Sequence, residues 1–265
     1  MKVRRLGFGA MRVCGPQIWG WPKDRANALA VLRRAYELGH NFFDTSDAYG
    51  PEVNELQIAE ALHPYPKDLV IATKGGLLRP SAPRWDRCGR PDHLRRALEA
   101  SLKRLRVERI DLYQLHAPDP EVPLADTVGA LADLQKAGKI RHIGVSNVSV
   151  AQLEKARRVA SIVSVQNEYN LGNRKFDDVL EVCRKSRIAF LPWYPLGAGA
   201  ALRPGKVKQV AAKHDATPAQ VALAWLLERS PVVLPIPGTA SLAHLEENAA
   251  AATLRLSSED LAMLD

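Results

Sequence analysis

The chain has 265 residues, of which 46% are hydrophobic and 25% charged, fractions typical of a globular protein rather than a disordered or fibrous one. Its formal net charge is +8, but the basic pairs are spread over different predicted helices, which argues against a nucleic-acid-binding surface. No apolar run approaches the ~20 residues of a membrane span, no secretory signal is recognisable, and Cys14, Cys88 and Cys183 form no CxxC pair. We therefore expect a cytoplasmic protein.

Short apolar runs alternate with helical patterns along the chain. In the first helical pattern Ala28, Val31 and Ala35 recur at spacings of three and four, and a later one opens with a capping box at residues 217–220 that has Pro218 at the first helical position. The short runs lack strict alternation, as is typical of strands buried on both faces. They are residues 6–10, 41–43, 69–73, 110–115, 140–145, 162–166, 188–193 and 232–237.

Eight strand–helix units in a chain of this length predict a closed (β/α)8 TIM barrel, which belongs to the α/β class. We expect it to form one domain that spans residues 1–265. A doubly wound open sheet is the alternative. Against it, the first turn carries only Gly7 and Gly9 and lacks the third glycine of a GxGxxG fingerprint.

Polar side chains follow the predicted strands, at the end of a barrel where active sites form. Asp44 and Lys74 end adjacent strands, so we expect a buried ion pair. A lysine cation near Tyr49 should lower the pKa of its phenol from about 10 and make it a general acid or base. His116 ends the next strand and would orient the same substrate oxygen.

No Ser/His/Asp arrangement and no cluster with metal-ligand spacing accompanies these four residues. A cofactor is therefore expected to carry the bond-making step, and hydride transfer fits. Each residue alone also has a structural explanation: a buried Lys or Asp is often half of an ion pair, and a His at a strand end is often a core residue. Their joint occurrence in this order favours a proton-transfer site.

Several segments in a fixed order resemble the aldo-keto reductase superfamily across nearly the whole chain. They are NFFDTSDAYG at 41–50, IATKG at 71–75, DLYQLH at 111–116, GKIRHIGVSN at 138–147, VQNEYN at 165–170 and IPGTASLAHLEEN at 236–248. The resemblance implies a single-domain barrel and an oxidoreductase with a catalytic tetrad of Asp44, Tyr49, Lys74 and His116.

The same resemblance implies how a nicotinamide cofactor would be held. Ser146, Asn147 and Gln166 would hold the carboxamide, and Trp193 would stack on the nicotinamide ring, although core packing is the alternative for this tryptophan. The pyrophosphate would pass a loop that starts at Leu196 and Gly197, with Arg203 and Lys206 as further charges. The residues implied at the adenosine end are Gly238, Thr239, Ser241, His244, Glu247 and Asn248.

The choice between NADP and NAD depends on this adenosine end. Many relatives carry Lys and Arg where this chain has Gly238 and His244, and those cations grip the 2′-phosphate of NADP. Thr239 and Ser241 still offer hydroxyl groups, and their loop opens a helix whose N–H groups suit a phosphate. We expect NADP (NADPH) as the cofactor, with NAD less favoured.

Two departures from the family stand out. The N-terminal β-hairpin that plugs the barrel in relatives is missing or shortened, because the first predicted strand starts almost at the beginning of the chain. A missing plug would expose apolar barrel ends. The loop after Gly197 is also short, which would speed cofactor exchange.

We expect a small-molecule carbonyl substrate bound by Met11, Trp19, Trp21 and Trp85, although the two tryptophans of the first loop could simply cap the barrel mouth. The pattern GAM…GPQIWG…DTSDAYGPEVNE is similar to that of pyridoxal reductases, which suggests an aromatic aldehyde such as pyridoxal. The alternatives are a cofactor-sensing interaction protein like the channel β-subunits of this fold, or a catalytically weak truncated barrel. We expect a monomer or weak oligomer that binds neither nucleic acid nor membrane.

Overall fold

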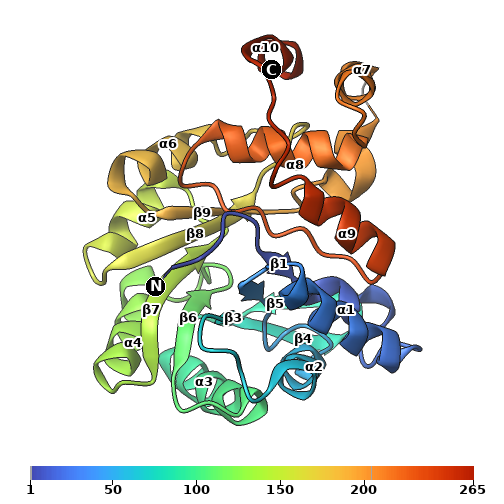
Figure 1. The fold of residues 1–265 in the computed structure, drawn as a ribbon. Helices are drawn as coiled ribbons and strands as arrows, with labels where there is room; N and C mark the ends of the chain where they lie inside the picture. The colour runs from blue at the N-terminus through green and yellow to red at the C-terminus, as the bar shows by residue number, and fades with distance from the viewer. Residues whose placement is uncertain (1, 204) are drawn as a thin grey trace.

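Seven parallel strands at the centre of the computed structural model form one curved sheet in the order β1-β2-β3-β6-β7-β8-β9 (Figure 1). The structure describes residues 2–203 and 205–265. Because all neighbouring strands are parallel, their carboxyl ends meet at one end of the sheet. The strands are β1 (Phe8–Gly9), β2 (Phe42–Asp44), β3 (Val70–Gly75), β6 (Ile110–Leu115), β7 (Ile140–Ser146), β8 (Ile162–Glu168) and β9 (Ala189–Trp193).

The eighth predicted strand, residues 232–237, is an extended segment that bonds to both edges of the sheet. Prolines at 235 and 237 lack the N–H groups that a regular ladder needs, so the segment forms only part of a strand's hydrogen bonds. These bonds still close the sheet into the predicted (β/α)8 barrel. They run from Phe190 N to Val232 O (2.8 Å), Leu234 N to Phe190 O (2.8 Å), Gly7 N to Pro235 O (2.9 Å) and Gly9 N to Pro237 O (3.1 Å).

Helices surround the strands, and the first and last of this ring lie side by side (Figure 1). An ion pair between Arg34 and Glu246 (2.8 Å) joins α1 to α9, so the helical layer closes as the sheet does. The helices are α1 (Arg25–Glu37), α2 (Val53–Leu62), α3 (Pro91–Leu105), α4 (Leu124–Lys136), α5 (Val150–Arg157), α6 (Asp177–Ser186), α7 (Gly205–Lys213), α8 (Pro218–Arg229), α9 (Leu242–Ala250) and α10 (Ser258–Leu264). Within the described residues, none of them is both long and apolar enough to cross a membrane.

The predicted capping box begins α8. The Thr217 side chain accepts a hydrogen bond from Gln220 N, and the Gln220 side chain accepts one from Thr217 N. Two donors at the helix start, which have no partner inside the helix, are thereby satisfied.

In β2 and β6, side chains that point into the barrel change from apolar to polar along the strand. In β2, Phe42 lies deeper and Asp44 lies at the carboxyl end, and in β6 Leu112 is followed two residues later by Gln114. A period of two places such pairs on the same face.

Residues 2–7 form no hairpin, yet the apolar interior stays buried, with Phe42 and Leu112 each 1% exposed. Val163 and Ala189, which pack against this interior, are only partly buried, so the expected exposure is found at a few residues rather than over the whole barrel end.

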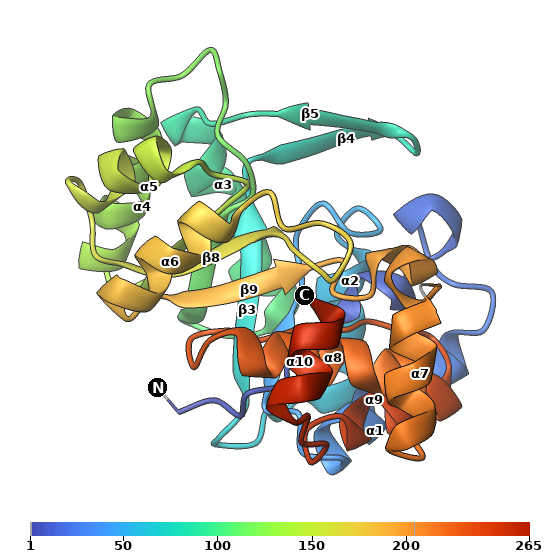
Figure 2. The same ribbon diagram turned by 90° about the horizontal axis from the view of Figure 1, so that it is seen from above.

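An antiparallel hairpin, β4 (Leu77–Ser81) and β5 (Arg84–Arg87), follows β3 at the carboxyl end of the barrel. Figure 2 shows it projecting away from the helical ring. Two short 3-10 helices, Ala10–Val13 and Pro16–Ile18, follow β1 at the same end. These loop-borne elements surround the place where the polar side chains gather.

Candidate active site

A cavity of about 450 Å³ opens at the carboxyl ends of the strands. Asp44, Tyr49 and His116 line it, and Lys74 lies directly behind them with a side chain that is fully buried. The structure thus brings together the four residues predicted to form the proton-transfer site.

Lys74 contacts both Asp44 and Tyr49. Its Nζ donates to Asp44 Oδ2 at 2.7 Å and to the backbone oxygen of Thr45 at 2.8 Å, and it lies 3.5 Å from Tyr49 Oη. Burial lowers the pKa of the ammonium group, and the charge of Asp44 opposes this shift. The predicted ion pair between Lys74 and Asp44 on adjacent strands is present, and its ammonium group faces the phenol of Tyr49.

The prediction that the pKa of Tyr49 is lowered is wrong. Burial, followed by the charge of Asp44, raises the pKa of the phenol well above its ordinary value. Desolvation of the phenolate and the negative charge of Asp44 outweigh the nearby cation of Lys74. Tyr49 is therefore held as a neutral phenol, which can donate a proton.

His116 faces Tyr49 across the cavity, with ring centroids 5.7 Å apart in an edge-on arrangement. Its Nδ1 lies 3.1 Å from Ser46 Oγ. Burial, helped by the positive charge of Lys74, lowers the pKa of the ring well below its ordinary value. The imidazole is therefore neutral, and one of its two nitrogens carries a proton.

A layer of amides beneath the tetrad was missed by the sequence reasoning. Gln114 Nε2 lies 3.4 Å from Asp44 Oδ1, and Ser164 Oγ donates to Gln114 Oε1 at 3.2 Å. The signal was available: Gln114 precedes His116 by two residues, so the two side chains share a face of the strand. These contacts fix the Asp44 carboxylate on the side away from Lys74.

The residues expected at the nicotinamide carboxamide all line the cavity. Ser146 Oγ donates to Gln166 O at 2.7 Å, and Gln166 Nε2 donates to Asp44 Oδ1 at 2.8 Å. Asn147 adopts a left-handed backbone conformation (φ 59°), which asparagine tolerates, and its Oδ1 accepts from Trp193 Nε1 at 3.1 Å. The half-buried Trp193 ring forms a flat wall beside these amides.

The residues expected at the phosphate and adenosine end are divided. Leu196 and Gly238 line the cavity, but the other expected residues do not. Ser241 instead accepts from His244 N and begins α9, and Lys206 Nζ donates to Leu264 O at 2.8 Å. The expected residues outside the lining are Gly197, Arg203, Lys206, Thr239, Ser241, His244, Glu247 and Asn248.

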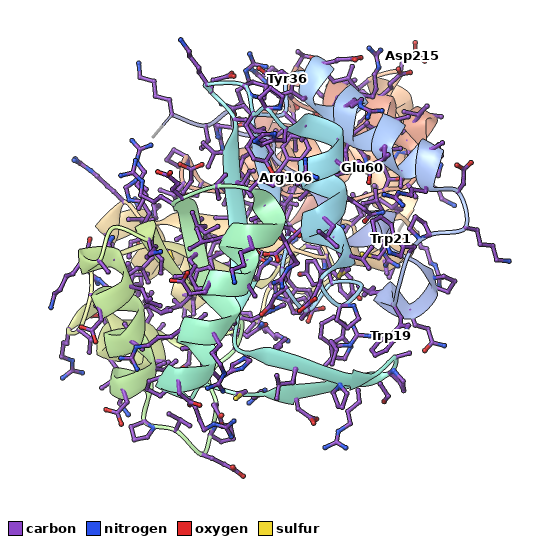
Figure 3. All side chains as sticks on the ribbon, turned by 90° about the horizontal axis from the view of Figure 1, so that it is seen from below. Trp19, Trp21, Tyr36, Glu60, Arg106 and Asp215 are labelled. Atoms are coloured by element: carbon purple, nitrogen blue, oxygen red, sulfur yellow. The ribbon has the colours of Figure 1, made fainter. Side chains whose placement is uncertain are left out.

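The four expected substrate residues are also divided. Met11 and Trp85 line the cavity, and the Trp85 ring lies edge-on to Tyr49 at 6.3 Å. Trp19 and Trp21 lie outside the lining and are 37% and 40% exposed. Figure 3 shows Trp19 beside the outer part of the β4–β5 hairpin and Trp21 on the outside of the molecule.

Arg79 connects the hairpin to the first loop. Its guanidinium lies 3.7 Å from the centre of the Trp85 ring and 5.4 Å from that of Trp19. It also donates to the backbone oxygens of Ile18 (3.1 Å) and Ala48 (3.3 Å). A stacked, multiply bonded arginine of this kind holds its aromatic neighbour in place.

The composition of the lining fits a nicotinamide cofactor. Ser146 and Asn147 supply polar groups next to the flat Trp193 ring, while Gly238 lies close to the N-terminus of α9, whose free N–H groups suit a phosphate. No group of three or more His, Cys, Asp or Glu side chains among residues 2–203 and 205–265 is placed to hold a metal ion.

Known proteins are similar over the full length. The chain is 51% identical to an uncharacterized oxidoreductase of Schizosaccharomyces pombe, covering 100% of this chain and 87% of that protein. It is 45% identical to pyridoxine 4-dehydrogenase of Escherichia coli K12, covering 99% and 94%. The crystal structure of an aldo/keto reductase from Klebsiella pneumoniae in complex with NADP and acetate superimposes with a TM-score of 0.83 at 29% identity, covering 99% and 90%.

A family model matches residues 5–265, and its description is the aldo/keto reductase family. Members of this family are oxidoreductases that use a nicotinamide cofactor. The full-length match, the barrel and the gathered tetrad agree, and the chain belongs to the aldo/keto reductase family.

Proposed function

We propose that the protein is an NADP(H)-dependent carbonyl reductase that converts an aldehyde or ketone to an alcohol, with Tyr49 as the general acid. The observation that carries this proposal is the position of Lys74 Nζ, 3.5 Å from Tyr49 Oη and 2.7 Å from Asp44 Oδ2. A nicotinamide cofactor, when bound, supplies the hydride for the carbonyl carbon.

The chain's own residues handle the proton. Tyr49 is held neutral by burial and donates its phenolic proton to the carbonyl oxygen as negative charge develops there. The phenolate that remains is stabilised by the ammonium group of Lys74. Asp44 keeps that ammonium group in place, and His116 on the opposite side of the cavity orients the oxygen by a hydrogen bond.

NADP is the proposed cofactor, with Ser146, Asn147, Gln166 and Trp193 at the nicotinamide end. The bound NADP of the Klebsiella pneumoniae relative supports this choice, as does the GTAS loop at 238–241, whose hydroxyl groups precede α9. Thr239, Ser241, His244, Glu247 and Asn248 are proposed for the adenosine end, outside the lining of the cavity. NAD is the less favoured alternative.

The proposed substrate is a small aromatic aldehyde such as pyridoxal. Similarity to pyridoxine 4-dehydrogenase supports it, since that relative is named for the reverse reaction on the corresponding alcohol. The Trp85 ring next to Tyr49 and His116 offers an aromatic wall against which a planar ring can pack.

The test is oxidation of NADPH and of NADH over a panel of aldehydes that includes pyridoxal, with wild type and Tyr49→Phe. Loss of the general acid should lower kcat by about 10² to 10⁴-fold. Tyr36→Phe is the matched control, because that half-buried tyrosine lies outside the cavity and its hydroxyl donates to Asp68. Undiminished turnover by Tyr49→Phe would refute the assignment of the acid, and faster turnover with NADH would refute the cofactor choice.

A further inference from the structure

Two residues between Asp44 and Tyr49 form a chain of polar contacts to His116. Ser46 Oγ lies 3.1 Å from His116 Nδ1 and donates to Asp47 Oδ1 at 3.0 Å. Ser46 Oγ also accepts a hydrogen bond from Ala48 N at 3.1 Å. The hydroxyl thus has two neighbours that compete for its single proton, the Asp47 carboxyl group and the Nδ1 of His116.

Asp47 has unusual surroundings for a carboxyl group. Burial, followed by the nearby charge of Glu55, raises its pKa to about 8, although the Ser46 hydroxyl and the charge of Arg104 oppose the shift. Its charge therefore changes within the range in which enzymes are assayed. The charged or titratable groups that face it from its own loop and from the elements packed against it are Tyr49, Glu55 of α2, Lys74 of β3, Arg104 of α3 and Tyr113 of β6.

We propose that Ser46 is a positioning residue that decides which ring nitrogen of His116 carries the proton, and that the charge state of Asp47 sets the direction of the Ser46 hydroxyl. This inference rests on the proposed carbonyl reductase function and adds a regulation of the same site.

When Asp47 is ionised it can only accept, so the Ser46 proton points to it. Ser46 Oγ then offers a lone pair to the histidine, and His116 carries its proton on Nδ1, with a bare Nε2. When Asp47 binds a proton, its hydroxyl donates to Ser46 Oγ, and the Ser46 proton turns to Nδ1. His116 then carries its proton on Nε2, and the change takes up one proton in total, at Asp47.

The two states differ in what they offer the substrate oxygen. The Nε2–H form donates a hydrogen bond to the carbonyl oxygen, so it favours the reaction, and it prevails below the pKa of Asp47. In the reverse direction the alcohol gives its proton to Tyr49 and its oxygen meets the same Nε2 donor, so the bare Nε2 above that pKa slows both directions. The direct readout of the relay is thus the tautomer of one histidine.

The tautomer can be measured without substrate by ¹⁵N NMR of the histidine rings in the full chain between pH 6 and 10. His116→Gln identifies the His116 signals among those of the seven histidines. We expect wild-type His116 to change from Nε2–H to Nδ1–H as the pH rises through about 8. A single tautomer over the whole range would overturn the inference using the wild type alone.

Two variants separate the relay from a general effect of pH. Asp47→Asn replaces the carboxyl group with an amide that cannot ionise, so the His116 tautomer should no longer change with pH. Ser46→Ala removes the hydroxyl, so the tautomer should no longer follow pH. A pH-dependent tautomer that persists in either variant would contradict the proposal.

The kinetic counterpart is kcat for aldehyde reduction as a function of pH. Wild type should lose at least about fivefold from pH 7 to 9.5, Asp47→Asn should lose less than twofold, and Asp47→Asn should add nothing in the Ser46→Ala background. An equal effect of Asp47→Asn in both backgrounds would place it outside the relay. A wild type that reduces no carbonyl while its His116 tautomer changes with pH as expected would refute the proposed function and leave the relay standing.

Discussion

The floor and the walls of the cavity are built from different parts of the fold. The floor, which we define as Asp44, Lys74 and His116, comes from the carboxyl ends of strands, and each of these side chains is at least nine-tenths buried. The walls, which we define as Ile18, Leu77 and Trp85, come from the first loop and the β4–β5 hairpin. Parallel register sets the floor to within one residue, whereas the walls depend on contacts between loops. We therefore expect mutations in the floor to change the proposed chemistry and mutations in the walls to change substrate choice.

The largest effect is expected from Lys74→Met, which removes the cation of the floor. Removing one partner of a buried ion pair leaves Asp44 uncompensated, and we expect a loss of about 3 kcal/mol in the free energy of unfolding together with loss of reductase activity. Urea denaturation and NADPH oxidation measure the two.

The double variant Lys74→Met/Asp44→Asn serves as the control for this prediction. It removes the unpaired charge, so it should regain most of the stability and none of the activity. A double variant as unstable as the single one would show that packing around the Lys74 stem, rather than charge, holds the floor.

The next largest effect is expected from Gly238→Ala, at the point where the sheet closes into the barrel that positions the floor residues. A Cβ at Gly238 would lie 2.2 Å from Gly9 O, a backbone atom that cannot turn away. Gly238→Ala should therefore lower the free energy of unfolding by about 1 to 3 kcal/mol and weaken cofactor binding. Gly129→Ala in α4 is the matched control, because its Cβ meets nothing within 4 Å and alanine favours a helix. Equal stability of the two variants would contradict the close approach.

The floor could be predicted from the sequence and the walls could not, for a physical reason. Each floor residue ends an apolar run, so its place follows from the strand itself. Trp19 and Trp21 lie in a loop whose path depends on Arg79, which bonds to Ile18 O from 61 positions further along the chain. Periodicity and local propensity carry no information on such a contact.

The same limit applies to the pKa of Tyr49 and to the adenosine end. Proximity to a lysine suggested a lowered phenol pKa, but the balance between burial and charge depends on the depth of the site, which a sequence does not give. At the adenosine end, Ser241 is used to begin α9 and Glu247 accepts from Thr217 Oγ1. A residue in a family motif can stabilise the fold, bind a ligand or do both, and only its contacts in the structure show which.

Arg79→Ala tests the walls while leaving the floor intact. Loss of the stacked guanidinium should free Trp85 and the hairpin, raising KM for an aromatic aldehyde by about 5 to 10-fold, which corresponds to the ~1–1.4 kcal/mol of a stacking contact of this kind. Because the tetrad is untouched, kcat should change less than twofold. Arg84→Ala is the control, since that arginine is exposed in the same hairpin and pairs with Asp86. A fall in kcat with unchanged KM would mean that Arg79 acts on the floor through Ala48 O.

The smallest effect is expected from Trp21→Ala, which decides how far the walls extend. Its ring is 40% exposed and packs on Arg25 at 4.0 Å, outside the cavity. KM for pyridoxal and for a bulkier aromatic aldehyde should therefore change less than twofold. The cost to the free energy of unfolding should also be small, since an exposed cation–π contact contributes only about 0.5–1 kcal/mol. Trp85→Ala under the same assay should raise KM, because its ring faces the reacting groups. If Trp21→Ala raised KM for the bulkier aldehyde alone, the first loop would reach larger substrates, and the wall would include the residue that the sequence reasoning first placed there.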